Sequence, residues 1–281
     1  MPLRTSPPVR VVVIDDSVVI RRVLTDMLAA DPDIEVVGVA SNGKLGLDKI
    51  RAVKPDIVTL DIEMPVMDGL TTLPLLRAEF PKLPVIMFST LTTRGGTAAL
   101  DALALGATDY LTKPESVGGR DQAIAAIRAE LLPKVKVLGR PRSALRPRTT
   151  IRPVTPLRAP APGKGGLAGT ARVDIVVIAV STGGPKALQD LIPRLPANLP
   201  VPVVMVQHMP PVFTGLLAER LNRDSKVHVV EAANGMPLEP ASVYIAPGGH
   251  HMVVAKLPTG AVVTRLNDGP PENSCRPAAD P

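Results

Sequence analysis

The segment VVVIDDS at residues 11–17 contains four β-branched residues that run directly into two aspartates and a serine. This order is typical of a buried strand that ends in a polar turn and a helix cap. Apolar residues then recur at the spacing of one helix face, at Ile20, Val23, Leu24, Met27 and Leu28. A strand followed by such a helix is the repeating unit of a parallel sheet covered by helices.

The same alternation of strand and helix patterns continues to about residue 133. Short β-branched runs bounded by turn residues predict five strands, at 11–15, 34–39, 56–60, 84–88 and 108–111. Five strands with five helices and right-handed crossovers give a doubly wound, flavodoxin-like parallel sheet. In this fold class the ligand site lies at the carboxyl ends of the strands.

A second alternation starts near residue 173 and predicts another α/β domain with a mainly parallel sheet. The patterns favour a strand, a tight turn and a helix, followed by a second strand and helix, at 174–180, 181–184, 185–192, 201–207 and 213–221. Further short strands are expected at 227–230, 243–246, 251–255 and 261–265.

The net charge of +6 is concentrated in one segment of the chain. Residues 134–172 hold ten basic residues and no acidic one, which leaves the rest of the chain at −4. This segment is rich in proline and glycine and has little apolar periodicity, so it is interpreted as a solvated linker rather than a site for an anionic partner. We therefore expect a first domain at 9–133, a linker at 134–172 and a second domain at 173–281.

Length and composition exclude several classes of protein. The 281 residues suggest two domains, and 45% apolar with 21% charged residues excludes a wholly disordered chain. Aromatic residues make up 2% and tryptophan is absent, which argues against base-stacking surfaces for single-stranded nucleic acid. Cys275 alone can form neither an internal disulfide nor a structural zinc site. No apolar run approaches the roughly 18 residues of a membrane span, and no signal peptide is evident, so we expect a soluble cytoplasmic protein.

Three carboxylates are expected to meet at one edge of the first sheet. Asp15 and Asp16 follow the first strand, and Asp61 closes the third. An acidic pair after a strand can be no more than a helix N-cap, but three carboxylates at close range are costly unless a cation is present. Mg²⁺ takes oxygen ligands and keeps several waters, so the arrangement predicts a magnesium site.

Two further polar residues are expected at the same edge. Ser89 ends the fourth strand, and Lys113 ends the fifth. A metal, a carboxylate, a hydroxyl and an ammonium group together are suited to moving a phosphoryl group onto Asp61, with charge neutralised by Mg²⁺ and Lys113.

A serine lies on the turn between the first strand and the first helix of the second half. Ser181 follows five apolar residues and precedes Thr182 and two glycines, as in a nucleophile elbow. His208 ends the next strand, so the two side chains could form a nucleophile and its base. Taken alone, a glycine-rich turn can also cap a helix or cradle a phosphate, and a single histidine is often structural.

The other histidines, His228, His250 and His251, sit singly or as an adjacent pair. They are interpreted as structural or surface residues.

The first half of the chain strongly resembles the receiver domain of bacterial two-component response regulators. The motifs that carry the resemblance occur in order, as VVVIDDS, DIEMPVMDG at 61–69, MFST at 87–90 and YLTKP at 110–114. The resemblance implies that Asp61 is the phospho-acceptor. It also implies that Asp16, Asp61 and the backbone carbonyl of Glu63 bind Mg²⁺ directly, with Asp15 acting through water.

The receiver resemblance extends to the remaining polar residues of this edge. It implies that Ser89 senses the phosphoryl group, that Lys113 belongs to the same site and that Tyr110 is the aromatic residue that changes rotamer. The phosphoryl donor would be a chemotaxis histidine kinase.

The whole arrangement resembles the chemotaxis protein-glutamate methylesterase family, whose members also deamidate receptor glutamines. The resemblance is carried by the receiver, the basic linker and four motifs: VIAVSTGGPKAL at 177–188, VVMVQHMPPVFT at 203–214, APGGHHM at 246–252 and LNDGPPENSCRPAAD at 266–280. It implies that Ser181 is the nucleophile and His208 the base, with Thr182 beside the nucleophile. Methyl-accepting chemotaxis receptors would be the substrates, and the esterase would need no cofactor.

The third member of that family's catalytic triad, an aspartate in a G-M-G-x-D-G segment, has no counterpart in this chain. Neither Asp268 nor Asp280 matches it. The resemblance covers about the first three-fifths of the catalytic domain, so we expect that domain to be incomplete here.

Three interpretations follow from the sequence. The first is a phosphorylation-regulated esterase. The second is a regulator with a DNA-binding output domain, but the second half offers no basic recognition helix, which argues against nucleic acid as a partner. The third is a phospho-receiver or docking protein without catalytic activity, suggested by the missing aspartate.

Overall fold

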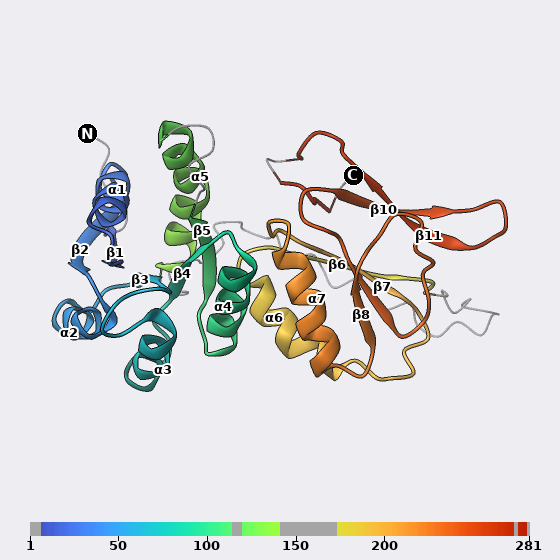
Figure 1. Cartoon of the computed structure of the whole chain (residues 1–281), viewed down its shortest axis with the longest axis horizontal. Coiled ribbons are helices and arrows are strands. Elements are labelled where there is room, and N and C mark those ends of the chain that lie inside the picture. Colours follow the sequence, from blue (N-terminus) through green and yellow to red (C-terminus); the bar gives the residue numbers. More distant parts are fainter. Residues whose placement is uncertain (1–6, 114–119, 141–172, 273–274, 280–281) are drawn as a thin grey trace, which may run out of the picture.

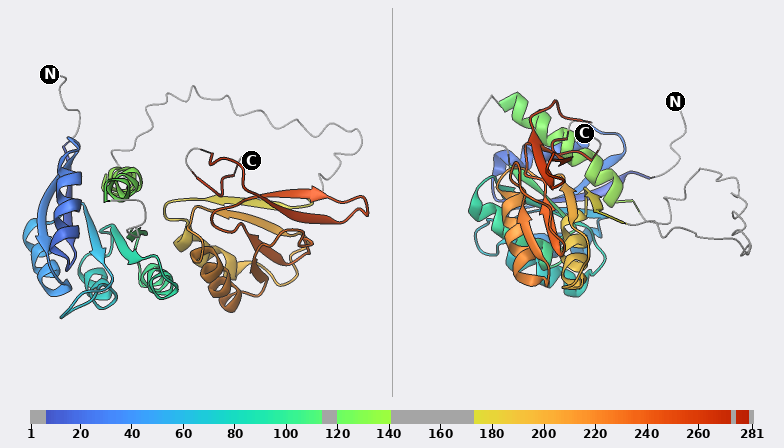
Figure 2. Two further views of the ribbon diagram at one scale, coloured as in Figure 1. Left: turned by 45° about the horizontal axis from the view of Figure 1, so that its top comes forward. Right: turned by 90° about the vertical axis from the view of Figure 1, so that its right-hand side faces the viewer.

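The computed structural model of the chain describes residues 7–113, 120–140, 173–272 and 275–279. These residues form two α/β domains that lie side by side (Figures 1 and 2). Most of the expected linker, together with Asp280, lies outside the described residues. Within the described ranges, no helix is both long and apolar enough to cross a membrane.

The N-terminal domain is built on a five-stranded parallel sheet in the order β2-β1-β3-β4-β5. Its strands are β1 Val9–Ile14, β2 Ile34–Ala40, β3 Ile57–Asp61, β4 Val85–Thr90 and β5 Asp109–Lys113. Each strand lies within two residues of its predicted position. The prediction of a doubly wound sheet is therefore confirmed.

Five helices cover the two faces of this sheet, namely α1 Val18–Ala29, α2 Gly43–Val53, α3 Gly69–Glu79, α4 Thr93–Ala104 and α5 Arg120–Leu138. Successive side chains along β1 point to opposite faces of the sheet, so this strand contributes apolar side chains to the core on both faces. Val11 and Val13 pack in the cluster that includes residues of α1 and α5. Val12 and Ile14 pack in the cluster on the opposite face, with α2, α3 and α4. The buried β-branched run of β1 thus lies between two helical layers.

The ends of two helices illustrate which local signals determine them. Ser17 caps α1 as expected, because its hydroxyl accepts a hydrogen bond from the backbone N–H of Ile20 at 3.3 Å. Helix α5 continues to Leu138, beyond residue 133, where the first domain is expected to end. Val135 in the added turn is fully buried, and packing of this kind compensates for the hydrogen bond that a proline within a helix removes.

The C-terminal domain has a four-stranded parallel sheet in the order β6-β7-β9-β8 and an antiparallel hairpin of β10 and β11. The strands are β6 Val176–Val180, β7 Val203–Gln207, β8 His228–Glu231, β9 Ser242–Ile245, β10 His251–Lys256 and β11 Val262–Asn267. Its helices are α6 Gly184–Leu191, a 3₁₀ turn at Ile192–Arg194 and α7 Phe213–Asp224. The prediction of a second, mainly parallel α/β domain is confirmed.

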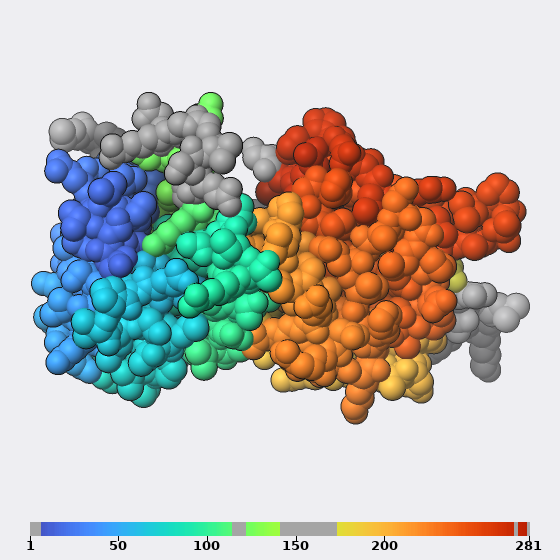
Figure 3. Space-filling model, viewed as in Figure 1, coloured from blue at the N-terminus to red at the C-terminus, as the bar shows by residue number. Residues whose placement is uncertain are grey.

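The two domains share one cluster of buried apolar side chains, which runs from the α2–α4 side of the first sheet into the second domain. At the contact, the ring of Tyr110 in β5 stacks on the ring of Phe213 in α7, with centroids 5.1 Å apart and planes 6° from parallel. Gly96 in α4 lies so close to Leu216 that a Cβ added there would come within 2.7 Å of the leucine Cδ1. Figure 3 shows the resulting continuous surface between the domains.

Candidate functional site

The predicted acidic pocket forms at the carboxyl edge of the first sheet. Asp15 follows β1 and Asp61 ends β3, and their side chains are 1% and 3% exposed, respectively. One carboxylate oxygen from each of Asp15, Asp16 and Asp61 lies within 4.8 Å of the other two. The strand ends thus bring together the three carboxylates that the sequence placed there.

Lys113, at the end of β5, partly neutralises this pocket. Its Nζ lies 2.7 Å from Oδ2 of Asp61 and 3.2 Å from Oδ2 of Asp15. Burial raises the pKa of Asp61 to about 6, and the hydrogen bond from Lys113 offsets only part of this effect. Burial also raises the pKa of Asp15. The single ammonium group of Lys113 therefore does not neutralise all the carboxylates of the pocket.

The donor set of the pocket fits a hard divalent cation. Oδ2 of Asp15 is buried and, despite its ion pair with Lys113, has no hydrogen-bond partner. A buried oxygen in this state is costly unless another cation binds it. Three carboxylates in one cluster are the type of ligand that Mg²⁺ prefers.

A small cavity of about 20 Å³ adjoins the carboxylates, and Ser89 and Glu63 line it together with Asp61 and Lys113. The hydroxyl of Ser89 is buried and donates a hydrogen bond to the backbone carbonyl of Gly95 in α4, at 2.9 Å. Ser89 thus connects this cavity to the helix that contacts the second domain.

Tyr110 lies away from the acidic pocket. It is 5% exposed, stacks on Phe213 and lines a different cavity at the contact between the domains. Burial raises its pKa well above the ordinary value, with the charge of Asp109 adding to the effect. No local pattern in the sequence predicts this placement, because the motif around Tyr110 belongs to the first domain alone.

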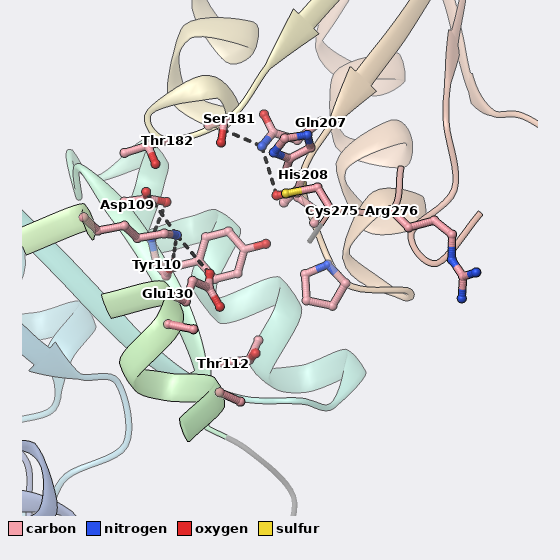
Figure 4. Close-up of a pocket in the computed structure, with 15 residues that line it drawn as sticks. Asp109, Tyr110, Thr112, Glu130, Ser181, Thr182, Gln207, His208, Cys275 and Arg276 are labelled. Atoms are coloured by element: carbon pink, nitrogen blue, oxygen red, sulfur yellow. Dashed lines mark hydrogen bonds and ion pairs between the residues drawn. The ribbon is translucent and has the colours of Figure 1, made fainter. Parts of the chain in front are cut away.

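The second candidate site is a cavity of about 480 Å³ between the two domains (Figure 4). One wall comes from the ends of β6 and β7, with Ser181, Thr182, Gln207 and His208. The opposite wall comes from β5 and α5 of the first domain. The two residues predicted as nucleophile and base therefore face one space.

Local backbone geometry presents Ser181 to this cavity. The strand β6 ends at Val180, and the N–H of Gly184 donates to the carbonyl of Ser181 at 2.7 Å to close the turn. Gly183 has a φ of 75°, which a residue with a side chain rarely adopts. Ser181 is exposed at the start of α6, where free backbone N–H groups can stabilise an anion.

His208 directly follows β7, which pairs with β6, the strand that precedes Ser181. Among the described residues, no hydrogen bond joins the side chains of Ser181 and His208, although both line the cavity. Such bonds are often long or absent before substrate binds. His208 is exposed as a whole residue, but partial burial of its imidazole lowers its pKa by desolvation.

The wall contributed by the first domain was not predicted. Asp109, at the start of β5, is 2% exposed, and its carboxylate lies 3.2 Å from Nζ of Lys134 in α5. Lys134 also pairs with Glu130 at 3.1 Å and donates to the carbonyl of Tyr110 at 2.9 Å. These charged groups stand across the cavity from Ser181 (Figure 4).

The remaining histidines take no part in this cavity. His251 is buried, with Nε2 at 3.1 Å from the carbonyl of Pro270 and Nδ1 accepting from the N–H of Ala278 at 3.2 Å. Nδ1 of His250 lies 2.5 Å from Oδ1 of Asp268, so this aspartate pairs with a histidine other than His208. His228 is exposed on β8.

Comparisons with known proteins match one family to each of the two domains. Residues 11–125 match the family "Response regulator receiver domain", and residues 176–281 match "CheB methylesterase". A protein-glutamate methylesterase/protein-glutamine glutaminase of Nocardioides sp. is 48% identical over 287 residues, covering 98% of this chain and 74% of that protein. The protein of the same name from Trichodesmium erythraeum is 43% identical, covering 98% of this chain and 77% of that protein.

A solved structure of the Thermotoga maritima CheB methylesterase catalytic domain is 47% identical, covering 38% of this chain and 56% of that chain, with a TM-score of 0.37. The alignments with the full-length relatives extend over both domains in the same order. This chain therefore belongs to the protein-glutamate methylesterase/protein-glutamine glutaminase family, with an N-terminal receiver domain.

Proposed function

We propose that this protein is a phosphorylation-regulated serine esterase, which hydrolyses glutamate methyl esters on methyl-accepting chemotaxis receptors and deamidates receptor glutamines. The observation that carries the proposal is the placement of Ser181 and His208 at the ends of adjacent parallel strands, in one cavity whose far wall belongs to the receiver. The assigned domains are the receiver at 9–133, the linker at 134–172 and the catalytic domain at 173–281. We place the reaction in the cytoplasm.

The proposed reaction is acyl transfer through Ser181. Oγ of Ser181 attacks the ester carbonyl carbon while His208 accepts the hydroxyl proton. The negative charge that develops on the carbonyl oxygen is stabilised near the N–H groups that begin α6. His208 then protonates the leaving oxygen and methanol departs. Water, deprotonated by His208, releases glutamate and restores the serine. For a glutamine substrate the leaving group is ammonia, and no cofactor takes part.

Asp61 is the proposed phospho-acceptor, and its phosphoryl donor is a chemotaxis histidine kinase. Asp16, Asp61 and the backbone carbonyl of Glu63 would hold Mg²⁺, with Asp15 acting through water. When bound, Mg²⁺ neutralises charge on the transferring phosphoryl oxygens. Nζ of Lys113, which already contacts Asp61, is placed to bind one of those oxygens.

The receiver controls access to the esterase in this proposal. Tyr110 and Lys134 line the cavity opposite Ser181, so a receptor segment can reach the nucleophile only when the domains separate. A phosphoryl group on Asp61 competes with the carbonyl of Gly95 for the hydroxyl of Ser89. Loss of that bond loosens the first turn of α4, next to the close contact of Gly96 with α7.

An ion pair between the domains offers a test of this control. Arg220 in α7 donates to Asp101 in α4 at 2.7 Å. Arg220→Ala is expected to raise the rate of the unphosphorylated protein about 2- to 5-fold, because a partly exposed pair contributes up to ~1 kcal/mol to the closed arrangement. The assay is receptor demethylation without phosphodonor.

The matched control for this prediction is Arg22→Ala, which breaks the exposed pair with Asp26 within α1. This control should leave the rate unchanged. Asp101→Ala should reproduce the effect of Arg220→Ala, and the double variant should add nothing. Equal basal rates for Arg220→Ala and the parent protein would contradict control through this contact.

The pH dependence of hydrolysis follows from the lowered pKa of His208. The neutral imidazole is the base, so a lowered pKa keeps the base active at lower pH. We expect the acid limb of kcat/KM to fall below pH 6.5, the ordinary value for histidine. The check is kcat/KM measured from about pH 5 to 9, with folding verified at each pH. An acid limb above pH 7 would show that another group is the base.

Release of methanol from membranes that carry methylated receptors tests the proposed activity directly. Phosphorylation of the protein without any methanol release would instead support the docking interpretation, and retention on DNA would support a transcriptional one. The matches to named methylesterases, which cover 98% of this chain and 74% and 77% of the two relatives, favour the esterase over both alternatives.

A further inference from the structure

Gln207 is the last residue of β7 and is 2% exposed, although it lines the cavity that holds Ser181 and His208. Its side-chain amide lies between these two residues (Figure 4). Nε2 donates to the backbone carbonyl of Ser181 at 3.3 Å and to the backbone carbonyl of His208 at 3.2 Å. A single side chain therefore bridges the two turns that carry the proposed nucleophile and base.

The chemistry of the two partners fixes the orientation of this amide. Carbonyl oxygens only accept hydrogen bonds, so the NH₂ group must face both turns, and both of its hydrogens are used. Oε1 points the other way, is buried and has no hydrogen-bond partner. It lies against Gly184, where an added Cβ would come within 2.2 Å of the oxygen.

Other connections between the two turns are few. The backbone N–H of His208 donates to the carbonyl of Val180 at 3.4 Å, a long bond that continues the pairing of β6 with β7. In the part of the chain that the structure describes, no other side-chain hydrogen bond joins residues 181–184 to residues 208–211. The buried amide of Gln207 is thus the main polar connection between the turns beyond the strand ends.

We propose that Gln207 is a positioning residue, which holds the turns of Ser181 and His208 in the relative placement that proton transfer requires. The inference rests on the proposed esterase function, since it assigns Ser181 and His208 their roles. Gln207 does not touch the reacting atoms. Its effect on the rate comes through the geometry of the pair, where a displacement of about 1 Å can cost about 100-fold.

Two substitutions separate the hydrogen bonds of Gln207 from its volume. Gln207→Met keeps an uncharged side chain of similar length and removes both donors. We expect kcat for methyl ester hydrolysis to fall about 10- to 100-fold with KM changed less than about 2-fold, because the loss appears in the transition state. The control is Gln189→Met, on α6, whose buried Nε2 makes no hydrogen bond and whose loss should leave kcat unchanged.

Gln207→Glu should change the pH dependence of kcat in a characteristic way. A carboxylate facing two carbonyl oxygens is repelled, whereas the protonated acid can donate one hydrogen bond. The ratio of kcat for Gln207→Glu to kcat for the parent protein should therefore rise as pH falls, whereas the same ratio for Gln207→Met should stay flat. The titration of the base is taken from the acid limb of each protein's own kcat/KM profile, because a carboxylate at residue 207 also acts on the neighbouring imidazole of His208.

All rates are measured on the full chain and divided by the folded fraction from thermal unfolding. If folding of Gln207→Met is impaired, Gln207→Asn provides a second route, because its side chain keeps the amide but is one methylene too short to bridge both carbonyl oxygens, and kcat should fall similarly. Parent-like kcat per folded molecule in Gln207→Met, or a pH-independent ratio in Gln207→Glu, would overturn the positioning role. Hydrolysis retained in Ser181→Ala would instead overturn the esterase mechanism itself, so the two failures are distinguishable.

Discussion

Ser181→Ala is expected to lower the rate of receptor demethylation by at least about 100-fold, and His208→Ala by a similar factor. The double variant should be little worse than either single one, because a nucleophile and its base act as a unit. The measurement is methanol release from methylated receptor membranes, together with labelling of the serine by a fluorophosphonate. Labelling should disappear in Ser181→Ala and slow markedly in His208→Ala.

The chain supplies matched controls for both changes. Ser225 is a serine after α7, and His228 is an exposed histidine on β8, and neither lines the cavity. Ser225→Ala and His228→Ala should retain the parent rate. Additive losses in the double variant would indicate that Ser181 and His208 act independently, and a retained rate in Ser181→Ala would exclude a covalent mechanism through this residue.

Asp61→Asn is expected to reduce acyl-phosphate labelling from a small-molecule phosphodonor to background, while leaving the basal esterase rate intact. The physical reason is that an amide cannot form the acyl phosphate, and that the acidic pocket and the cavity of Ser181 are separate spaces with separate linings. The measurement pairs acid-stable, base-labile phosphate incorporation with basal demethylation of the same preparation.

The control for this substitution is Asp48→Asn on α2, an exposed aspartate whose partner is Arg51. Asp48→Asn should incorporate as much acyl phosphate as the parent protein. Labelling that persists in Asp61→Asn would show that another carboxylate accepts the phosphoryl group. A large loss of basal rate would show that the two sites are not independent.

Much of the fold follows from local patterns in the sequence. The β-branched run of β1 is buried on both faces, so it must be a central strand of a parallel sheet, and the polar residues after it must lie at the sheet edge. Pro133 shows the limit of such local reasoning. Local patterns predict a domain boundary there, but burial of Val135 and the ion pair of Lys136 with Asp31 favour continuation of α5.

The two candidate sites differ in how far the sequence could describe them. Strand order alone brings Asp15 and Asp61 together, and it places Ser181 and His208 on adjacent strands. The contact between the domains could not be predicted in this way, because it depends on the fit of two surfaces. The roles of Gly96, which has no side chain, and of the Phe213 ring become evident only from the contact between the two domains, where α4 packs against α7.

The stacked pair at the domain contact has a practical consequence for observing the protein. The chain contains no tryptophan and two tyrosines, so tyrosine emission is not masked by a stronger fluorophore. One of the two tyrosines, Tyr110, is pressed against Phe213 where the domains meet. Separation of the domains would move that phenol into water, whereas Tyr244, held by a 2.8 Å hydrogen bond to the carbonyl of Pro237, stays in place as an internal reference. The tyrosine fluorescence of the unlabelled protein should therefore report whether the two domains are in contact or separated.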